Sequence, residues 1–461
     1  MRNLALVLIV AACTPPSMRT LHAPPQELST PIDPSCEEHL SDQEPASDDT
    51  VDCKDQTRRG MTRRAQAGVF TDFNESNSTV RLIFTGDTGV RDEHDPTQIG
   101  AGPACVIEHA KRACGEACDG VVLLGDNLYT NGLNDTVDSQ FLTNYTAKWA
   151  DTGAVFYVPG NHDWGFLPVV VPAQLKRAQR QLGELRRMHA SGTDVRGDSH
   201  FWSTTIGDGR LVGLDSNYLV RGCDVRGSGD KQRLRCAGDP RKEDDKRVSY
   251  STMLTGLTAP GGGPTVVVGH HPWLSHGEHG HAGDYWDRTI LGVPMALDKG
   301  AGFRWALDTI VGPNSAIYLS GHDHNTQVAR VDDNTLSVVV GAGGKVTGPG
   351  PHTGENGSKR IDGFELEHYC DLGYAMLDVS QQAITLRVHT LPAPGGTDAL
   401  EDHRARCEAH WRKIRPDAEL PTSPSCTQWT WTQRDGTVGT WSASSECPVI
   451  PAPTCGAPHP K

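Results

Sequence analysis

Five segments of the chain place side chains that can bind metal ions directly after an apolar run and a glycine. In one of them the apolar run Val121–Leu124 is followed by Gly125, Asp126 and, three residues later, Tyr129. Short apolar runs are typical of strands buried on both faces, and ligands of open α/β sheets bind at the carboxyl ends of such strands. Carboxylate and phenol oxygens are hard donors that suit a highly charged cation. This segment alone fits equally well a turn capped by Asp126 with Tyr129 in the core.

The other four segments repeat this design. Their potential ligands are Asp87, then Asn161, His162 and Asp163, then His270 and His271, and last His322, Asp323 and His324. A hydrolytic two-metal centre needs a bridging carboxylate that holds the ions about 3.5–4 Å apart, and neutral amide and imidazole ligands that keep the site positive. It also needs a nearby histidine that protonates the leaving group. The five segments together therefore predict a two-metal site.

The five segments resemble the signature of the purple acid phosphatases, a branch of the calcineurin-like metallophosphoesterase superfamily. That signature is DxG, GDxxY, GNH followed by an acidic residue, VxxH and GHxH. The chain has it at Asp87–Gly89, Gly125–Tyr129, Gly160–Asp163, Val267–His270 and Gly321–His324. Gly89 stands where most of the superfamily has a ligand histidine, and Tyr129 would replace that ligand. The resemblance covers about residues 80–389 and is strongest to the small, single-domain mammalian type, from which His271 departs because that type has tyrosine there.

This resemblance implies two ions with separate sets of ligands. Iron(III) would be held by Asp87, Asp126, Tyr129 and His324. The divalent ion (iron, zinc or manganese) would be held by Asn161, His270, His322 and the bridging Asp126. His162 and His279 would contact the phosphate and protonate the leaving group, while Asp163 and Glu278 orient these two histidines. We expect Asn127 to shape its loop, and His276 and His281 to lie at the surface.

The resemblance also implies a fold and an activity. Strand-like runs that alternate with helical patterns, such as residues 171–190, predict an α/β domain over residues 79–390. The resemblance specifies a four-layer α/β/β/α sandwich, and residues 374–389 predict a hairpin that closes one sheet. The expected activity is the hydrolysis of phosphomonoesters by an acid phosphatase of broad substrate range. Two alternatives are a phosphodiesterase or nucleotide phosphohydrolase on the same site, and a catalytically silent surface lipoprotein.

The two ends of the chain differ in composition from this domain. Residues 1–12 contain Arg2 and a short apolar run, as in a signal peptide, and they precede Cys13 in a pattern that looks like a bacterial lipobox. We therefore expect an exported lipoprotein that Cys13 anchors to the cell envelope, or a secreted protein if this anchor is absent. Residues 13–78 predict a low-complexity tether, and residues 391–461 a Cys-rich extension that begins with a helix at Asp398.

Cysteine content and net charge reduce the range of possible compartments and substrates. Of the 13 cysteines, 12 remain if Cys13 carries lipid, and this even number favours disulfides in an oxidising compartment. The pairs hypothesised from spacing are Cys36 with Cys53, Cys223 with Cys236, and Cys447 with Cys455. The formal net charge of −14 argues against nucleic-acid binding, because phosphate backbones need a basic surface. Small phosphate esters remain possible substrates, since bound metal ions reverse the local charge.

Overall fold

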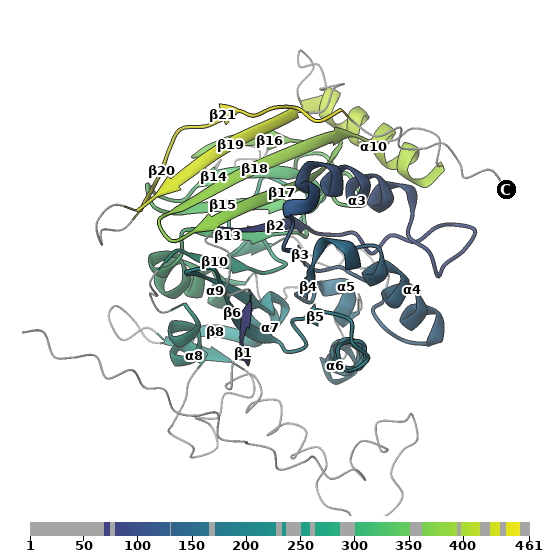
Figure 1. The fold of residues 1–461 in the computed structure, drawn as a ribbon, viewed down its shortest axis with the longest axis horizontal. Helices are drawn as coiled ribbons and strands as arrows, with labels where there is room; N and C mark the ends of the chain where they lie inside the picture. The colour runs from purple at the N-terminus through teal and green to yellow at the C-terminus, as the bar shows by residue number, and fades with distance from the viewer. Residues whose placement is uncertain are drawn as a thin grey trace, which may run out of the picture. The chain divides into compact units, whose positions relative to one another are not determined.

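The protein is represented by a computed structural model (Figure 1). It describes residues 69–73, 79–129, 131–165, 171–226, 233–236, 250–258, 263–285, 300–350, 362–393, 398–414, 425–433 and 439–451, all within the unit Met61–Lys461. The predicted signal peptide and lipid-anchor residue Cys13 lie outside these residues. Within the described part of the chain, no helix is both long and apolar enough to pass through a bilayer.

Sheet I has eight strands in the order β1-β6-β7-β10-β13-β15-β14-β16. Its centre is parallel: β7 (Gly209–Leu214), β10 (Thr265–Val268), β13 (Ile317–Ser320) and β15 (Leu336–Val340). The outer strands are β1 (Val69–Phe73), β6 (Phe201–Ile206), β14 (Thr326–Arg330) and β16 (Phe364–His368). Residues 69–73 were predicted to belong to the tether, but they form β1, which pairs in parallel with β6.

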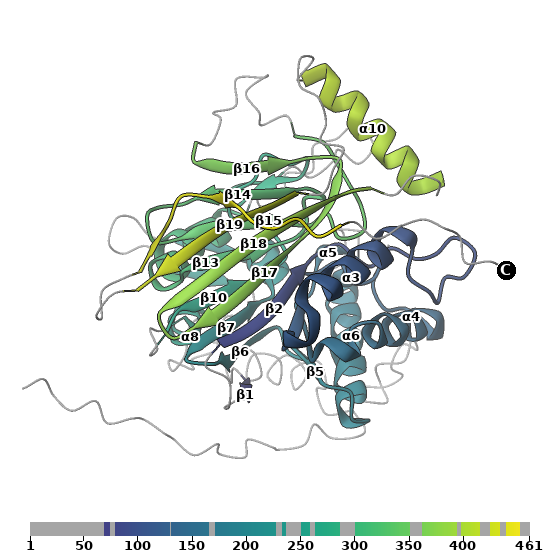
Figure 2. The ribbon, with the colours of Figure 1, turned by 45° about the horizontal axis from the view of Figure 1, so that its top comes forward.

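Sheet II has nine strands and a parallel centre made of β2 (Thr79–Thr85), β3 (Gly120–Leu123), β4 (Ala154–Tyr157) and β5 (Val195–Arg196). Next to β2, the predicted hairpin is present as β17 (Asp371–Ser380) and β18 (Ala383–Pro392). The C-terminal region continues the sheet with β19 (Ser425–Thr432), β20 (Thr440–Trp441) and β21 (Ser445–Glu446). Figure 2 shows β2, β17, β18 and β19 side by side.

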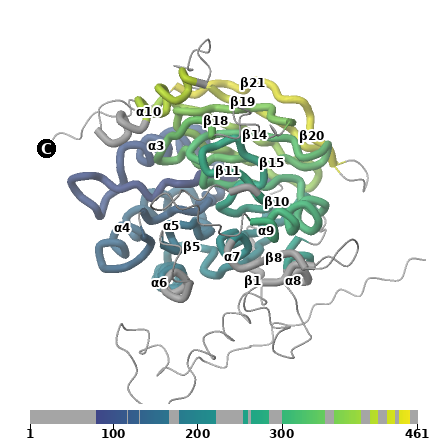
Figure 3. Tube along the Cα trace, turned by 180° about the vertical axis from the view of Figure 1, so that it is seen from behind, coloured from purple at the N-terminus to yellow at the C-terminus, as the bar shows by residue number. Residues whose placement is uncertain are grey.

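Helices cover the outer face of each sheet. Sheet II is covered by α3 (Ala101–Cys114), α4 (Thr136–Ala147) and α6 (Val171–Ala190), and the short α5 (Asn161–Trp164) follows β4. Sheet I is covered by α7 (Ser216–Gly222), α8 (Tyr250–Leu257) and α9 (Ala301–Ala306), seen from behind in Figure 3. Helix α10 spans Asp398–Ile414, where the sequence predicted one. The remaining short strands are β8 (Cys223–Arg226), β9 (Arg233–Cys236), β11 (Gly280–His281) and β12 (Asp284–Tyr285).

Apolar side chains on both faces of the strands build three stacked cores. In β2, Leu82 and Phe84 lie between the two sheets, whereas Ile83 packs under the helices of sheet II. In β10, Val266 and Val268 face the same central core, and Val267 packs under the helices of sheet I. Burial on both faces explains why these strands are unbroken apolar runs. The predicted four-layer α/β/β/α sandwich is thus confirmed.

One of the three disulfide pairs hypothesised from the sequence is contradicted by the structure. Cys426 is bonded to Cys447, so the hypothesis that paired Cys447 with Cys455 was wrong. Cys426 is brought to Cys447 by the antiparallel pairing of β19 with β21, a contact that sequence spacing does not reveal. Cys223 and Cys236 are opposite each other in the register of β8 and β9, while Cys36 and Cys53 lie outside the described residues.

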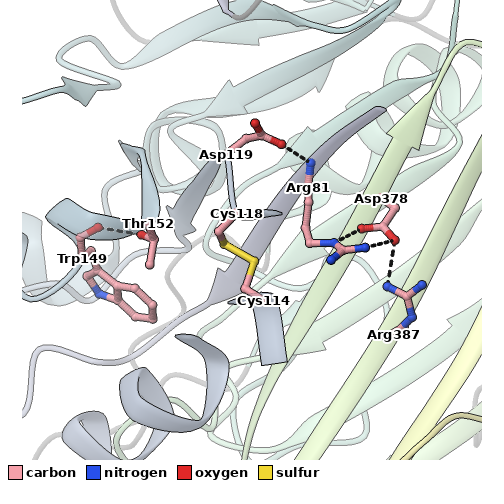
Figure 4. The surroundings of a disulfide bond; sticks show 8 residues. All are labelled: Arg81, Cys114, Cys118, Asp119, Trp149, Thr152, Asp378 and Arg387. Atoms are coloured by element: carbon pink, nitrogen blue, oxygen red, sulfur yellow. Dashed lines mark hydrogen bonds and ion pairs between the residues drawn. A yellow bond between two sulfur atoms is a disulfide. The ribbon is translucent and has the colours of Figure 1, made fainter. Parts of the chain in front are cut away.

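Two further disulfides secure the surface elements. One joins Cys370, after β16, to Cys407 of α10. The other joins Cys114 to Cys118 at the end of α3 (Figure 4). The same figure shows Arg81 of β2 next to Asp378 of β17, with the Arg81 Nε atom 2.5 Å from the carboxylate.

Candidate metal centre

Three predicted iron ligands meet at the carboxyl ends of β2, β3 and β13. The Tyr129 hydroxyl group donates a hydrogen bond of 2.9 Å to Asp87 Oδ1 and lies 3.3 Å from His324 Nε2. His324 Nε2 lies 3.4 Å from Asp87 Oδ1. A phenol, a carboxylate and an imidazole thus present their donor atoms to one another. We call these three residues the phenol group.

Three predicted ligands of the divalent ion form a second cluster. Asn161 Oδ1 lies 2.8 Å from His270 Nε2 and 2.9 Å from His322 Nδ1. The two imidazole nitrogen atoms are 3.2 Å apart. We call these three residues the imidazole group. Imidazole nitrogen and amide oxygen donors suit a divalent ion such as zinc or iron(II).

Asp126 connects the two groups. Its Oδ1 atom lies 3.3 Å from His270 Nε2, and one ligand atom from each of Asp87, Asp126 and His270 lies within 4.8 Å of the other two. A shared carboxylate between two donor sets is the arrangement that a dinuclear centre needs. All seven predicted ligands are therefore brought together, and their donor chemistry fits two ions.

Hydrogen bonds between the ligand side chains and the backbone fix the orientation of these ligands. His270 Nδ1 lies 2.8 Å from the carbonyl oxygen of Leu124, so its Nε2 atom faces Asp126. The backbone N–H of His322 donates to Asp87 Oδ2 at 2.7 Å, and that of His162 donates to Asp126 Oδ1 at 2.8 Å. Such contacts orient metal ligands and select the imidazole tautomer.

The backbone is strained at three of the predicted ligands. Of the four non-glycine residues with positive φ in the described part of the chain, three are Asp87 (59°), Asp126 (53°) and His322 (71°); the fourth is Cys370. A left-handed conformation costs roughly 1–3 kcal/mol per residue unless the surrounding structure enforces it. Backbone strain that is concentrated at residues with donor atoms indicates a functional site.

Two glycines allow the ligand loops to approach each other. Gly125 has a φ of +91°, and a Cβ atom there would lie 2.4 Å from His270 Nδ1. A Cβ atom at Gly160 would lie 2.1 Å from the backbone nitrogen of Asp126. The glycine that precedes each ligand in these two motifs is thus required by close contact between neighbouring loops.

Burial sets the protonation of the carboxyl groups. Burial raises the pKa of Asp87 to about 7, and the nearby charge of Asp126 adds to this effect. Burial also opposes ionisation of Asp126, but His270 and His162 outweigh it, so the pKa of Asp126 lies below its usual value. Burial and the charges of Asp87 and Asp126 raise the pKa of the Tyr129 phenol well above 10. A bound cation would reverse the balance at Asp87 and Tyr129, because it favours their ionised forms.

The imidazoles of His322 and His324 are neutral at ordinary pH. Burial lowers the pKa of His322 well below 6.5, and the surrounding histidines lower it further. Burial lowers the pKa of His324 in the same way, followed by the positive charge of Lys345. Neutral imidazole is the form that binds metal ions.

The two histidines expected to act on the phosphate lie beside the ligands. His162 Nε2 is 3.8 Å from Asp126 Oδ2, and its ring centroid lies 4.5 Å from that of Tyr129. The ring centroid of His279 lies 4.8 Å from that of His322 and 5.5 Å from that of His324. Both imidazoles therefore lie next to predicted metal ligands.

Asp323 anchors the segment that carries His279. Its Oδ1 atom accepts the backbone N–H of His279 at 2.7 Å, and its Oδ2 atom accepts the Ser275 hydroxyl group. Ser275 Oγ in turn accepts the backbone N–H of Gly277 at 2.8 Å and a side-chain N–H of Gln327 at 3.1 Å. The residue between the two ligand histidines of GHxH thus positions His279.

Asp163 has a role in the loops that the sequence did not predict. Its carboxylate accepts backbone N–H groups from Gly160 (2.7 Å), Leu128 (2.9 Å) and Asn127 (3.2 Å), and the Asn127 side chain at 3.0 Å. These bonds tie the loop after β4 to the loop after β3. Asp163 therefore holds the Asp126 loop, and Asn127 shapes that loop as predicted.

His276 and His271 are both buried. The prediction that His276 lies at the surface was wrong: its ring stacks on Phe364 with centroids 3.9 Å apart, and its Nδ1 atom lies 2.9 Å from Glu367 Oε1. His271 lies 2.9 Å from Ser216 Oγ through Nδ1, and its ring centroid is 4.5 Å from that of His322. It therefore packs behind a ligand of the imidazole group.

Lys345 is a site residue that the sequence analysis missed. Its Nζ atom lies 3.2 Å from the centroid of the Tyr129 ring. It follows β15 and the glycine-rich residues Gly341–Gly344, which repeat the pattern of an apolar run, glycine and a chemically active side chain. That pattern could have revealed it.

The chain is similar in sequence to proteins of a known family. Residues 80–326 match the family model of the calcineurin-like phosphoesterases. A similar curated protein is purple acid phosphatase 3 of Arabidopsis thaliana, which is 22% identical over 351 residues, covering 75% of this chain and 80% of that protein.

Similar solved structures include GAP50, the anchor in the inner membrane complex of Plasmodium, with 16% identity and a TM-score of 0.41 over 72% of this chain and 94% of that chain. The purple acid phosphatase PPD1 from yellow lupin (Lupinus luteus) has 14% identity and a TM-score of 0.41 over 70% and 53%. PhoD has 12% identity and a TM-score of 0.47 over 82% and 74%.

The close approach at Gly160 can be tested with Gly160→Ala. We expect this change to lower the free energy of unfolding by roughly 1–3 kcal/mol and to weaken metal binding, because the new methyl group displaces the Asp126 loop. Gly183→Ala is the matched control, since a Cβ atom there meets no neighbour and alanine favours the helix by roughly 0.5–1 kcal/mol. Urea unfolding and calorimetric zinc titration measure both effects. Equal zinc affinity in the two variants would contradict the loop contact.

Metal affinity should increase as the pH rises from 5 to 7. The raised pKa of Asp87, about 7, keeps its carboxyl group protonated below that pH, so cation binding must release this proton. Zinc affinity of the metal-free protein is then expected to fall by at least about tenfold per pH unit from pH 7 to pH 5. Calorimetric titrations in two buffers of different ionisation enthalpy count the released protons. An affinity that stays constant over this range would show that Asp87 is already ionised.

Proposed function

The chain belongs to the calcineurin-like phosphoesterase family, and we propose that it hydrolyses phosphomonoesters at a dinuclear metal centre. The observation that carries this proposal is the pair of donor groups on either side of Asp126, each fitted for one ion. Broad substrate tolerance and activity at acidic pH belong to the same proposal. The resemblance to purple acid phosphatases and the match to one of them support it.

When bound, the two ions would activate a water molecule and stabilise the negative charge on the phosphoryl group. The side chains of this protein would provide the other requirements. Asp126 would hold the ions together, and His162 and His279 would contact the phosphoryl oxygens. One of these two histidines would donate a proton to the ester oxygen as its bond to phosphorus breaks. The products are phosphate and an alcohol.

The donor types favour different metals in the two positions. Asp87, Asp126, Tyr129 and His324 supply the carboxylate, phenol and imidazole donors that suit iron(III). Asn161, His270 and His322, with Asp126, suit a divalent iron, zinc or manganese ion. We include this mixed-metal centre in the proposal.

The cellular location of the protein forms a second part of this proposal. We infer export to the cell envelope with a lipid anchor at Cys13, or secretion without it, and small phosphate esters as the substrates met there. The disulfides Cys114–Cys118, Cys370–Cys407 and Cys426–Cys447 support an oxidising compartment.

Asn161→Ala tests the enzymatic proposal. It removes the oxygen atom that lies between His270 and His322, so kcat/KM for 4-nitrophenyl phosphate should fall by at least about 100-fold. The matched control is Asn334→Ala, since Asn334 lies in the turn between β14 and β15, at the opposite end of the strands from the metal ligands. This control should retain wild-type activity.

Three outcomes separate the candidate functions. Hydrolysis of 4-nitrophenyl phosphate that depends on Asn161 supports the proposal. Turnover of phosphodiesters or nucleotides alone would assign the same site to a different substrate class. Absence of turnover in a wild-type protein that binds two metal ions would indicate a catalytically silent surface protein.

Tyr129→Phe tests the iron position. A tyrosine phenolate bound to iron(III) gives a broad visible charge-transfer band, so the wild-type protein loaded with iron should be purple or pink and the variant colourless. Tyr374→Phe is a suitable control, because the Tyr374 hydroxyl group bonds His109 under helix α3 and not the metal ligands. Optical spectra with iron analysis of the same samples provide the measurement. A coloured Tyr129→Phe protein would exclude Tyr129 as the iron ligand.

A further inference from the structure

Lys345 places a positive charge against the phenol group, and the five metal-binding motifs do not include it. Its Nζ atom lies over the face of the Tyr129 ring, 3.2 Å from the ring centroid. The side chain is partly buried at the end of the loop that follows β15. The hydroxyl group of this ring contacts both Asp87 and His324, so the ammonium group lies over a side chain of the predicted donor set.

The backbone around Lys345 is fixed to the loops that carry those ligands. On its N-terminal side, the N–H of Gly343 donates to the carbonyl oxygen of Gly86 at 3.1 Å, directly before Asp87. On its C-terminal side, the N–H of Thr347 donates to the carbonyl oxygen of His324 at 2.8 Å. Lys345 is therefore held at a defined place beside the centre.

The positive charge of Lys345 lowers the pKa of two predicted ligands, His324 and Asp126. After burial, it is the largest cause that lowers the pKa of the His324 imidazole. It also contributes, after His270 and His162, to the low pKa of Asp126. The ammonium group thus acts on residues of the phenol group and on the connecting carboxylate.

A charge count indicates what this cation can do. Iron(III) and a divalent ion carry about +5, and ionised Asp87, Asp126 and Tyr129 reduce this to about +2. A phosphomonoester dianion with the hydroxide nucleophile brings about −3, whereas a phosphodiester with the same nucleophile brings about −2. The monoester thus brings one more negative charge than the diester, so an additional positive charge beside the centre, such as that of Lys345, would stabilise the bound monoester more.

We propose that Lys345 is a specificity-determining residue that binds the second negative charge of a phosphomonoester and disfavours phosphodiesters. The inference rests on the proposed hydrolysis and deepens it by naming the substrate class. A lysine suits the task because its ammonium group has three donors on a flexible stem, so it can contact a phosphoryl oxygen while it remains over the Tyr129 ring.

The test compares two substrates at pH 7, where the monoester is largely dianionic. Lys345→Met should lower kcat/KM for 4-nitrophenyl phosphate by about 10- to 100-fold and for bis(4-nitrophenyl) phosphate by less than about threefold. Lys345→Arg keeps the charge and should retain most of the monoester preference. Lys148→Met, at an exposed lysine after helix α4, is the matched control and should leave both substrates unchanged. An equal loss for both substrates, or no loss, would overturn the inference.

A binding measurement separates this inference from the proposed function. Inorganic phosphate should raise the thermal midpoint of the metal-loaded wild-type and Lys148→Met proteins, and raise that of Lys345→Met much less. Equal stabilisation of all three would overturn the role of Lys345 even if the enzyme is active. If the wild-type protein hydrolyses neither ester, the proposed function fails, and phosphate stabilisation that requires Lys345 still supports an anion site. The midpoints without phosphate show whether each variant is folded.

Discussion

The centre depends on the stacking of the two sheets, because each donor group combines residues from both. In the phenol group, Asp87 and Tyr129 follow strands of sheet II, and His324 follows a strand of sheet I. In the imidazole group, Asn161 comes from sheet II, and His270 and His322 come from sheet I. The central apolar core fixes the distance between the sheets and so the distances between donor atoms. Bound ions would in turn cross-link the sheets at their carboxyl edge, so folding and metal binding stabilise each other.

This arrangement costs stability where the donors meet. Asp87, Asp126 and His322 have left-handed backbone conformations, and two carboxyl groups lie buried within a few ångströms of each other. Neither feature helps an apolar core, since both strain and buried like charges oppose folding. A cation removes the electrostatic part of this cost, because it favours the ionised form of every carboxylate that it contacts.

The strands, and the residues that follow them, could be predicted from the sequence for one physical reason. Residues such as Leu82–Phe84 and Val266–Val268 are apolar on both faces, so the strand ends, and the side chains that follow them, can be read directly. The sequence did not predict the partners of Asp163, the burial of His276 or the bond between Cys426 and Cys447. Each of these depends on which distant segment lies opposite, and no local pattern records that. Lys345 lies between these two cases. Its motif, an apolar run and glycines before a charged residue, is visible in the sequence. Its position over Tyr129 depends on the packing of the loop after β15 against the ligand loops.

Two acidic residues within the motifs bind backbone instead of metal, and this links metal binding to the rigidity of the loops. Asp163 accepts N–H groups from the Asp126 loop, and Asp323 accepts the N–H of His279. Burial and then the charge of Asp126 raise the pKa of Asp163 to about 8, so this carboxyl group is protonated at neutral pH without a cation nearby. A protonated carboxyl group accepts hydrogen bonds less well than a carboxylate does. A cation on Asp126 would offset the second of these causes and lower the pKa of Asp163, which favours the ionised form that accepts these hydrogen bonds better. Metal binding would thereby tighten the loop that positions the bridging ligand.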